Sequence, residues 1–330
     1  MSSEVIRWGI LGTGGIAHKF AHGLAVLDDA ALVAVGSRRQ DTADAFGSTF
    51  GVPGRYATYE ALANDPEVDV IYVSTPHPFH YENTMMCLDA GKAVLCEKPF
   101  TINAAETEAL INRAREKNLF LMEAMWTRFI PAIVKVRELI TEGVIGEPRF
   151  LQADFSFHHE FDLEHRFFNL DLGGGALLDL GIYPISLASM VFGKQPTHIH
   201  SDAYIGDTGA DYQSAYIFRY DGIQMAAMMA GYQTEMPREA AIGGDKGTIR
   251  VHKPFWVSEG LTVTTIDGSE RVINMPKTGN GYNYQAAHVG ECLRARKTES
   301  DRMSLDESLA IMHTLDRIRA QWNFKYPGEK

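Results

Sequence analysis

Short apolar runs alternate with amphipathic stretches over the first 124 residues. The runs cover residues 5–11, 31–36, 68–73, 93–97 and 119–124, and their length is typical of buried strands. Between them, apolar side chains recur every three or four positions, which predicts helices. Strands that alternate with helices in this way predict an α/β fold with a doubly wound parallel sheet.

The pattern changes in the second part of the chain. A helix is predicted over residues 129–142, and two more at 284–295 and 305–322. In between, short alternating runs predict strands at 150–157, 198–205, 212–220, 224–232, 238–243, 248–252 and 261–266. We therefore expect two domains, residues 1–124 and 125–330, of which the second is an α/β domain with a large open, mainly antiparallel sheet.

The composition is that of a soluble globular protein. Of the 330 residues, 45% are hydrophobic and 22% are charged, which allows two domains with a sizeable core. No apolar run reaches the length of a membrane span, and the first residues do not resemble a secretory signal. The net charge of −11 argues against nucleic acids and anionic membranes as partners. Cys87, Cys96 and Cys292 lack metal-ligand spacing, so we expect reduced thiols, no metal and a cytoplasmic location.

A glycine-rich turn follows the first strand directly. The sequence GTGGIA at residues 12–17 has the form G-x-G-x-x-A and stands between a predicted strand and a predicted helix. Glycine lets the backbone approach a pyrophosphate, and the start of a helix offers it free N–H groups. The sequence therefore predicts a dinucleotide-binding Rossmann domain with contacts from Gly12, Thr13, Gly14, Gly15 and Ile16.

The end of the second strand bears on which dinucleotide binds. An NAD enzyme offers Asp or Glu to the ribose hydroxyls at this place. This chain has Ser37, Arg38 and Arg39 instead, and a hydroxyl with a guanidinium binds a 2′-phosphate that a carboxylate would repel. We therefore predict NADP, with NAD as the weaker alternative, and contacts from Ser37 and Arg38. The other interpretation is that both arginines are solvated loop charges.

Two further strands end in polar groups at the same edge of the sheet. After the strand at 68–73 we expect cofactor contacts from Ser74, Thr75, Pro76, His77 and His80. The strand at 93–97 ends in Glu97-Lys98-Pro99, where proline keeps Lys98 extended. The Lys98 amine then points off the sheet, where open α/β sheets bind ligands, although a single Lys-Pro pair also fits an ordinary exposed loop.

A second group of candidate residues lies in the other domain. Three glycines at 173–175 precede Asp179 and Tyr183, whose spacing of four residues puts both on one face of a helix. Pro184 predicts a kink or a helix restart there. The acid and the phenol fit a functional site and also fit local capping, and Arg166 upstream is either a site cation or a surface charge.

Together these motifs resemble those of one oxidoreductase family. The glycine motif, Thr75-Pro76-His77-x-x-His80, Glu97-Lys98-Pro99, Trp126-x-Arg128-Phe129 and the run from Gly173 to Tyr183 occur in this order. The chain resembles the Gfo/Idh/MocA family along nearly its whole length. Within the family it is similar to the branch of dimeric dihydrodiol dehydrogenases and NADP-dependent D-xylose dehydrogenases, on the basis of residues 119–131 and of tyrosine at position 183.

The resemblance implies roles for these residues. It implies that Lys98 and Tyr183 face the nicotinamide and the reacting carbon, and that Asp179 orients or tunes them. It also implies cofactor contacts from Arg38, Glu97, Lys98 and Arg166, a Lys98–Pro99 bond that is often cis, and an open sheet that often forms a dimer. Inositol dehydrogenases have histidine where this chain has Tyr183, which weakens an assignment as an inositol dehydrogenase. Many relatives have tryptophan where this chain has His165, so the resemblance does not assign the pocket wall at this position.

The implied chemistry needs a proton acceptor near the reacting oxygen. The pKa of free tyrosine and of free lysine is about 10, and the positive charge of a nicotinamide ring beside them in a buried site lowers both pKa values. We assign Tyr183 as the proton relay and Lys98 as its electrostatic partner, and the reversed assignment stays open. The candidates for the substrate pocket are Trp126, Arg128, Phe155, His158, Trp256 and Tyr284, with core packing as the alternative for most of them.

We therefore expect an NAD(P)-dependent dehydrogenase that acts on a CH–OH group of a cyclic sugar, a polyol or a trans-dihydrodiol. A reductase of an anhydro-ketose or dicarbonyl sugar is the first alternative. The second is a dinucleotide-binding regulator without turnover, which the intact Lys98, Asp179 and Tyr183 disfavour. The expected macromolecular partner is a second copy of the chain, in a homodimer or a tetramer.

Overall fold

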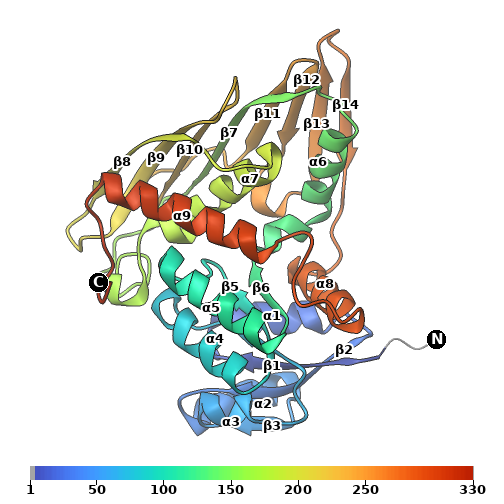
Figure 1. The fold of residues 1–330 in the computed structure, drawn as a ribbon, viewed down its shortest axis with the longest axis vertical. Helices are drawn as coiled ribbons and strands as arrows, with labels where there is room; N and C mark the ends of the chain where they lie inside the picture. Colours follow the sequence, from blue (N-terminus) through green and yellow to red (C-terminus); the bar gives the residue numbers. More distant parts are fainter. Residues whose placement is uncertain (1–3, 330) are drawn as a thin grey trace. The chain divides into compact units, whose positions relative to one another are not determined.

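The computed structural model describes residues 4–329, which divide into two compact units (Figure 1). The first unit comprises residues 4–126 with Thr278–Leu309, and the second comprises Thr127–Lys277 with residues 310–329. The expected division at residue 124 placed Thr278–Leu309 in the second domain, whereas this segment packs within the first unit. The reason is close contact between α8 (Tyr282–Arg294) and α1 (Gly15–Leu24), where a Cβ added at Gly23 would lie 2.9 Å from the Tyr282 Cβ.

The first unit is built on a parallel sheet with the strand order β3-β2-β1-β4-β5-β6. Its strands are β1 (Ile6–Leu11), β2 (Ala30–Gly36), β3 (Gly54–Tyr56), β4 (Val70–Val73), β5 (Ala93–Glu97) and β6 (Leu121–Ala124). This confirms the predicted doubly wound sheet. The short edge strand β3 was not located in the sequence because its three half-buried residues form no apolar run.

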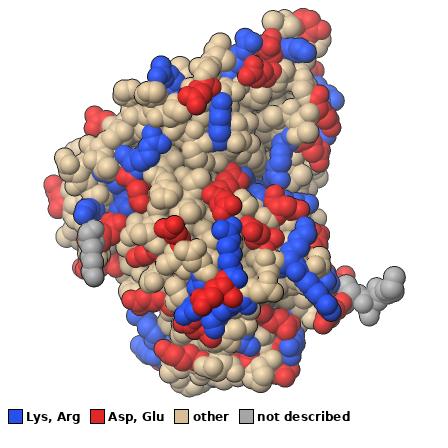
Figure 2. All heavy atoms as spheres, in the orientation of Figure 1, with Lys and Arg blue, Asp and Glu red and all other residues tan. Residues whose placement is uncertain are grey.

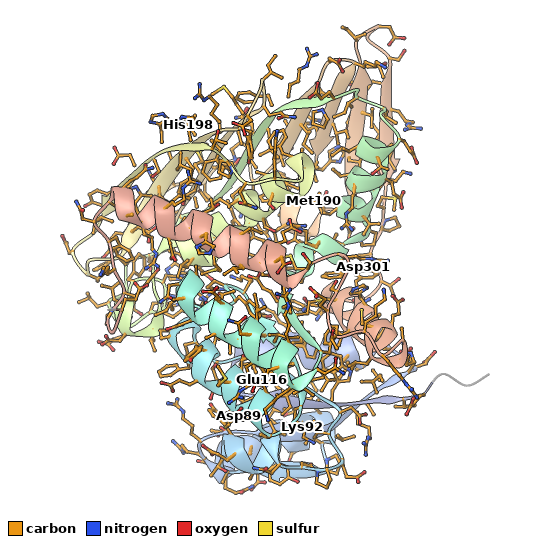
Figure 3. All side chains as sticks on the ribbon, viewed as in Figure 1. Asp89, Lys92, Glu116, Met190, His198 and Asp301 are labelled. Carbon is orange, nitrogen blue, oxygen red and sulfur yellow. The ribbon has the colours of Figure 1, made fainter. Side chains whose placement is uncertain are left out.

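Helices flank this sheet: α1, α2 (Gln40–Phe50), α3 (Tyr59–Ala63), α4 (His80–Asp89), α5 (Ala104–Lys117) and α8. The α4 and α5 helices lie side by side, and Arg113 bridges Asp89 and Glu116, which are labelled in Figure 3, at 2.9 and 2.8 Å. The N-cap residue of α2 is Arg39, and Asp41 lies in the first turn, where it pairs with the Arg39 guanidinium.

The second unit is built on a mixed sheet with the strand order β14-β13-β12-β11-β7-β10-β9-β8. Within this sheet, in residues 4–329, only β7 and β10 pair in parallel, so the predicted, mainly antiparallel sheet is confirmed. Its strands are β7 (Pro148–Ser156), β8 (His198–Ile205), β9 (Asp211–Arg219), β10 (Met225–Gly231), β11 (Ala240–Gly244), β12 (Gly247–Val251), β13 (Gly260–Thr265) and β14 (Glu270–Asn274). The sequence did not indicate β14 because most of its residues are exposed and polar.

One face of the mixed sheet is covered by helix α7 (Ile182–Phe192), which packs on β7 and β10 (Figure 1). The helix α6 (Pro131–Thr141) contacts α7, and α9 (Leu305–Gln321) begins in the first unit and ends in the second. Along β9, the aromatic side chains predicted to share one face are buried, and the alternate residues are exposed.

One long apolar helix lies in the interior, and charges of both signs mix on the surface (Figure 2). Leu170–Phe192 is long and apolar enough to cross a membrane, but 89% of its most apolar window is buried inside the protein, as in a core helix. On the face shown in Figure 2, lysine and arginine are interspersed with aspartate and glutamate and do not gather into a basic patch. This face gives no sign of a nucleic-acid interface.

Candidate active site

The glycine-rich turn after β1 leaves open space at the start of α1. Gly12 has φ +103°, and a Cβ at this residue would lie 3.0 Å from the Ser74 Oγ, which donates to the Leu11 carbonyl at 2.9 Å. A Cβ added at Gly14 or Gly15 would meet no described atom within 4 Å. Gly14 is the N-cap of α1 and provides no side-chain cap, so the first N–H groups of the helix are available to a ligand. The turn therefore fits a pyrophosphate group.

A cavity of about 420 Å³ lies beside the ends of β2 and β4. Its lining includes Arg38, Tyr59, Glu60, Thr75, Pro76 and Glu82. Burial raises the pKa of Tyr59, and the adjacent Arg38 guanidinium opposes that shift. Because Arg39 is engaged in its exposed pair with Asp41, Arg38 is the arginine of the two that faces this cavity.

Ser37 connects the two loops around this cavity. Its side chain is buried, and its Oγ lies 2.6 Å from the Thr42 Oγ1 and 3.5 Å from the Thr13 Oγ1. The hydroxyl therefore links the glycine-rich turn to the start of α2.

His80 holds two loops together. It is fully buried, with its Nε2 2.8 Å from the Thr75 carbonyl oxygen and its Nδ1 2.7 Å from the Pro99 carbonyl oxygen. The ring thus ties the loop after β4 to the loop after β5, whereas the sequence analysis expected it to contact the cofactor. His77 is also buried, and its ring centroid lies 5.7 Å from that of His80.

The end of β5 presents Glu97 and Lys98 at the same edge. Glu97 is 5% exposed and accepts hydrogen bonds from the Tyr72 hydroxyl and, at 3.1 Å, from the Lys98 backbone N–H. Lys98 is half-buried, and the Lys98–Pro99 bond is cis. The Glu97 carboxylate therefore joins β4 to β5 directly behind the lysine.

In the second unit, Asp179 lies on a π-helical turn, Leu177–Gly181, and the regular helix α7 begins at Ile182. This is the helix restart that Pro184 predicted, although the Asp179–Tyr183 stretch is not the regular α-helix that was expected. Gly173 and Gly175 just before the turn have φ of +75° and +124°, which favour glycine. Single π-turns inside helices occur frequently at functional sites.

Asp179 is a buried carboxylate with two partners. It is 3% exposed, and its Oδ2 accepts hydrogen bonds from the Arg166 Nη2 at 3.1 Å and from the Tyr232 hydroxyl at 3.0 Å. Burial, together with the Asp179 charge, raises the pKa of Tyr232, so this phenol stays protonated and donates. The sequence did not indicate Tyr232 because it lies 53 residues from Asp179 in an ordinary strand pattern.

Tyr183 lies against a pair of stacked aromatic rings. Its ring centroid is 5.2 Å from that of Phe155 on β7 and 6.5 Å from that of Trp256. Phe155 and Trp256 stack with centroids 3.5 Å apart and an interplanar angle of 10°. An apolar wall beside a phenol suits the flat C–H face of a ring substrate.

Other residues predicted for the pocket have different surroundings. Arg128 is 2% exposed and donates to the Ser186 hydroxyl at 3.1 Å and the Ser186 carbonyl at 2.8 Å, so it fastens α7 and is a core residue. His158 is exposed, and its backbone N–H bonds the Glu235 carboxylate at 3.3 Å. The sequence shows that these two residues are polar, but it does not show which residues they contact.

Trp126 and Tyr284 both belong to the first unit. Trp126 stacks on Tyr282 with ring centroids 4.4 Å apart and is 7% exposed. The Tyr284 hydroxyl accepts the Thr278 backbone N–H at 2.7 Å. The Trp126 ring therefore fastens the segment that begins at Thr278 to the rest of this unit, and the Tyr284 hydroxyl holds the start of that segment.

Family models match both parts of the chain. Residues 6–125 match the GFO/IDH/MocA oxidoreductase family with an NAD-binding Rossmann fold, and residues 133–250 match the GFO/IDH/MocA C-terminal domain. The trans-1,2-dihydrobenzene-1,2-diol dehydrogenases of Xenopus tropicalis and Mus musculus are 36% and 37% identical to this chain. These matches cover 97% and 98% of this chain and 99% of each relative.

Solved structures show the same fold. An aldose-aldose oxidoreductase from Caulobacter crescentus, complexed with glycerol, matches with a TM-score of 0.87 at 23% identity, over 96% of this chain and 97% of that chain. A 3-ketoreductase from Actinomadura kijaniata, in complex with NADP and TDP-benzene, matches with a TM-score of 0.84 at 25% identity, over 96% and 98% of the two chains.

The protonation of His80 provides a test of the loop geometry. Burial lowers the pKa of His80 to about 4, although its two backbone contacts oppose the shift. Between pH 6.5 and about 4 the unfolded chain then binds more protons than the folded chain, so the contribution to stability is complete above pH 6.5 and is lost as the pH falls. We expect the free energy of unfolding to fall by about 3 kcal/mol through His80 as the pH falls from 6.5 to about 4.

The measurement is urea denaturation of the wild type and of His80→Gln at several pH values. The variant keeps a donor for one carbonyl and does not titrate, so the difference in slope isolates the histidine. If the wild type gains stability relative to the variant as the pH falls, the two carbonyls hold an imidazolium and the stated direction is wrong.

Proposed function

Because this chain belongs to the Gfo/Idh/MocA family of NAD(P)-dependent oxidoreductases, which act on CH–OH groups, we propose that it moves a hydride between NADP and a secondary alcohol or carbonyl of a ring substrate. The observation that carries the proposal is the meeting of three neighbouring strand ends. Gly12 follows β1, Thr75 comes just after β4, and Lys98 follows β5. A phosphate cradle and an amine are thereby placed at one edge of the sheet.

In this proposal the first unit holds the cofactor. When bound, NADP accepts or supplies the hydride at its nicotinamide ring. The N–H groups at the start of α1 bind the pyrophosphate, and Arg38 binds the 2′-phosphate in the cavity of about 420 Å³, where Thr75 and Pro76 provide further contacts. The NADP complex of the 3-ketoreductase relative supports this choice of cofactor.

In this proposal Tyr183 transfers the proton and Lys98 acts as its electrostatic partner. During oxidation the Tyr183 side chain, as its phenolate, takes the proton of the substrate hydroxyl, and during reduction the phenol returns that proton. The Lys98 ammonium stabilises the negative charge that develops on oxygen. Asp179, paired with Arg166 and Tyr232, keeps a fixed negative charge four residues before Tyr183. The reversed roles, with Lys98 as the proton donor and acceptor, are the alternative.

The stacked rings of Phe155 and Trp256 beside Tyr183 favour a cyclic substrate with an apolar face. The dihydrodiol dehydrogenase relatives support a trans-dihydrodiol, and the aldose-aldose oxidoreductase shares the fold. We therefore propose a trans-dihydrodiol first, and a cyclic sugar or polyol second. A reductase of an anhydro-ketose or dicarbonyl sugar would use the same residues in the opposite direction.

We further propose that the protein works as a cytoplasmic homodimer, with a tetramer as the alternative. The cytoplasmic location is supported by three buried, free cysteines, of which Cys87 has its pKa raised by burial and is chemically inert. The dimer is supported by the face of the mixed sheet opposite α7.

That face carries exposed apolar side chains on three neighbouring strands, among polar residues such as His200 and Arg219. Tyr204 on β8, Ile217 on β9 and Met229 on β10 are 61%, 41% and 37% exposed, and a hollow of about 440 Å³ is lined in part by Tyr204, Ala215 and Met229. Figure 3 labels His198 on the same edge strand β8. A second copy of the same face covers such a surface with twofold symmetry.

Turnover tests the reaction. We expect NADP-dependent absorbance changes at 340 nm with a trans-dihydrodiol, D-xylose, D-glucose or myo-inositol. Lys98→Met and Tyr183→Phe should each lower kcat by about 100- to 10,000-fold, because each removes a group that acts on the reacting oxygen. Lys117→Met, which changes an exposed lysine on α5, is the control. Wild-type kcat in Lys98→Met contradicts the proposal, as does tight NADPH binding without any turnover.

Cofactor preference tests Arg38. Loss of a charged hydrogen bond to phosphate in Arg38→Ala should raise the KM for NADP by about 10- to 100-fold and leave the KM for NAD nearly unchanged. Arg39→Ala is the matched control, because Arg39 is paired with Asp41. Equal effects of the two substitutions, or a wild-type preference for NAD, would contradict the assignment of Arg38.

Light scattering after gel filtration tests the dimer. We expect the wild type to have twice the chain mass of 36.6 kDa and Ile217→Asp to elute at the single mass, because a buried charge at the interface is costly. The control is Ile266→Asp, which lies outside the three strands and is 84% exposed. A wild-type mass of one chain contradicts the proposal.

A further inference from the structure

The short segment Lys98-Pro99-Phe100 has two backbone N–H groups by which it can be held. Proline has no N–H, so in this stretch only Lys98 and Phe100 can donate. The Lys98 N–H donates to the Glu97 Oε2 at 3.1 Å, and the Phe100 N–H donates to the Glu123 Oε1 at 3.2 Å. Each backbone donor of the segment is therefore bound by a buried carboxylate.

The two carboxylates lie on opposite faces of the parallel sheet. Successive side chains of a strand point to opposite faces. The register pairs Glu123 on β6 with Cys96 on β5, so Glu123 shares the face of Cys96, and Glu97 lies on the other face. Tyr72, whose hydroxyl donates to Glu97, also lies on that other face. The Lys98 segment is thus held by side chains from both faces of the sheet.

Helix α9 anchors the Glu123 carboxylate. The Ser308 Oγ donates to the Glu123 Oε2 at 2.8 Å, and the serine is fully buried. Leu305, one turn earlier on α9, belongs to the same buried apolar cluster as Cys96 and Phe100. One oxygen of Glu123 therefore binds the backbone that follows Lys98-Pro99, and the other binds α9.

A carboxylate at this position needs a reason, because burying one is costly unless hydrogen bonds offset the loss of water. Glu123 is 1% exposed and stands in an otherwise apolar strand, where a leucine would not carry that cost. An apolar side chain would, however, leave the Phe100 N–H and the Ser308 hydroxyl without these acceptor oxygens. Because Phe100 comes two residues after Lys98, the contact acts directly beside the lysine.

We propose that Glu123 is a positioning residue, which fixes the backbone after Pro99 and so holds the Lys98 amine at the reacting oxygen. This inference rests on the proposed function of Lys98. Removal of the Glu123 contacts leaves the Glu97 contact at the Lys98 N–H intact. The lysine then keeps its place at the end of β5, but its amine loses a fixed position.

The test compares Glu123→Leu with Glu123→Gln in the full-length protein. Leucine removes both acceptor oxygens, whereas glutamine keeps an oxygen for the Phe100 N–H and an amide N–H that can donate to the Ser308 hydroxyl. In Glu123→Leu we expect kcat to fall about 10- to 100-fold, because small misplacements at a reacting centre are costly. The KM for NADP should stay unchanged, because the glycine-rich turn and Arg38 are not altered. Glu123→Gln should keep kcat within about threefold of the wild type.

Amide hydrogen exchange tests the same contact without turnover. In Glu123→Leu the Phe100 amide should exchange about tenfold faster relative to the amides of β5, because its acceptor is gone. A general loss of stability would speed up the exchange of both, so the ratio reports the local contact alone.

Ser308→Ala and Ser300→Ala form a matched pair. Each removes one buried serine hydroxyl of the first unit, but the Ser300 Oγ lies 2.7 Å from the His288 Nε2 and accepts the Met303 N–H at 3.1 Å. Ser308→Ala should lower kcat about 3- to 10-fold, because Glu123 loses its anchor on α9. Ser300→Ala should change neither kcat nor the relative exchange of Phe100. If Glu123→Leu does not fold, this pair decides the proposal.

Wild-type kcat in Glu123→Leu overturns the proposal, and so does a loss of kcat without faster relative exchange at Phe100. An equal loss of kcat in Glu123→Gln also overturns it, because the hydrogen bonds would then not be the cause. If the wild-type enzyme shows no turnover, the proposed function has failed. The exchange comparison then still decides whether Glu123 fixes the backbone beside Lys98.

Discussion

Parallel pairing of β1, β4 and β5 positions the glycine-rich turn, Thr75 and Lys98 in the first unit. In a parallel sheet the carboxyl ends of neighbouring strands lie at one edge. The register pairs Leu11 with Val73 and Val73 with Cys96, so the three strands end at the same level of the sheet. The loops that follow are tied together by buried groups, of which His80 and Glu97 are the clearest. The phosphate cradle and the lysine are therefore consequences of strand order.

The second unit depends on a different constraint, the cost of burying carboxylates. The cost of burying the Asp179 carboxylate is offset by hydrogen bonds from the Arg166 guanidinium and the Tyr232 phenol, which favour a charged carboxylate. Asp211 has a backbone N–H and a more distant hydroxyl, and burial raises the pKa of Asp211 to about 7. Asp211 thus holds the first residue of the π-turn, Leu177, and Asp179 in the middle of the same turn is paired with Arg166 and Tyr232.

The overall charge has little influence on the cofactor. A net charge of −11 repels an anionic ligand at long range, but at physiological salt the screening length is about 8 Å. Within that distance the helix start at Gly14 and the Arg38 guanidinium act on a phosphate. In the proposed function, local donors therefore decide the binding of NADP, even beside Glu60 and Glu82.

The periodicity of apolar residues was sufficient to predict the two sheets, because strand and helix patterns are local. It failed for β3 and β14, whose residues are half-buried or exposed and so leave no apolar signal. The motifs likewise located Gly12, Lys98, Asp179 and Tyr183, because glycine conformations, Lys-Pro geometry and the glycine-rich approach to a helix are local features.

Only the tertiary structure decided the partners of these groups. Tyr232, Asp211 and Glu123 have no local signature, and Arg128 and His80 proved to bond buried backbone. The sequence by itself determined the elements, the family and the positions of the chemical groups along the chain. The fold determined which of them meet, because a hydrogen bond depends on distance in space, and segments such as β6 and α9 come together only when the sheet and its helices have packed.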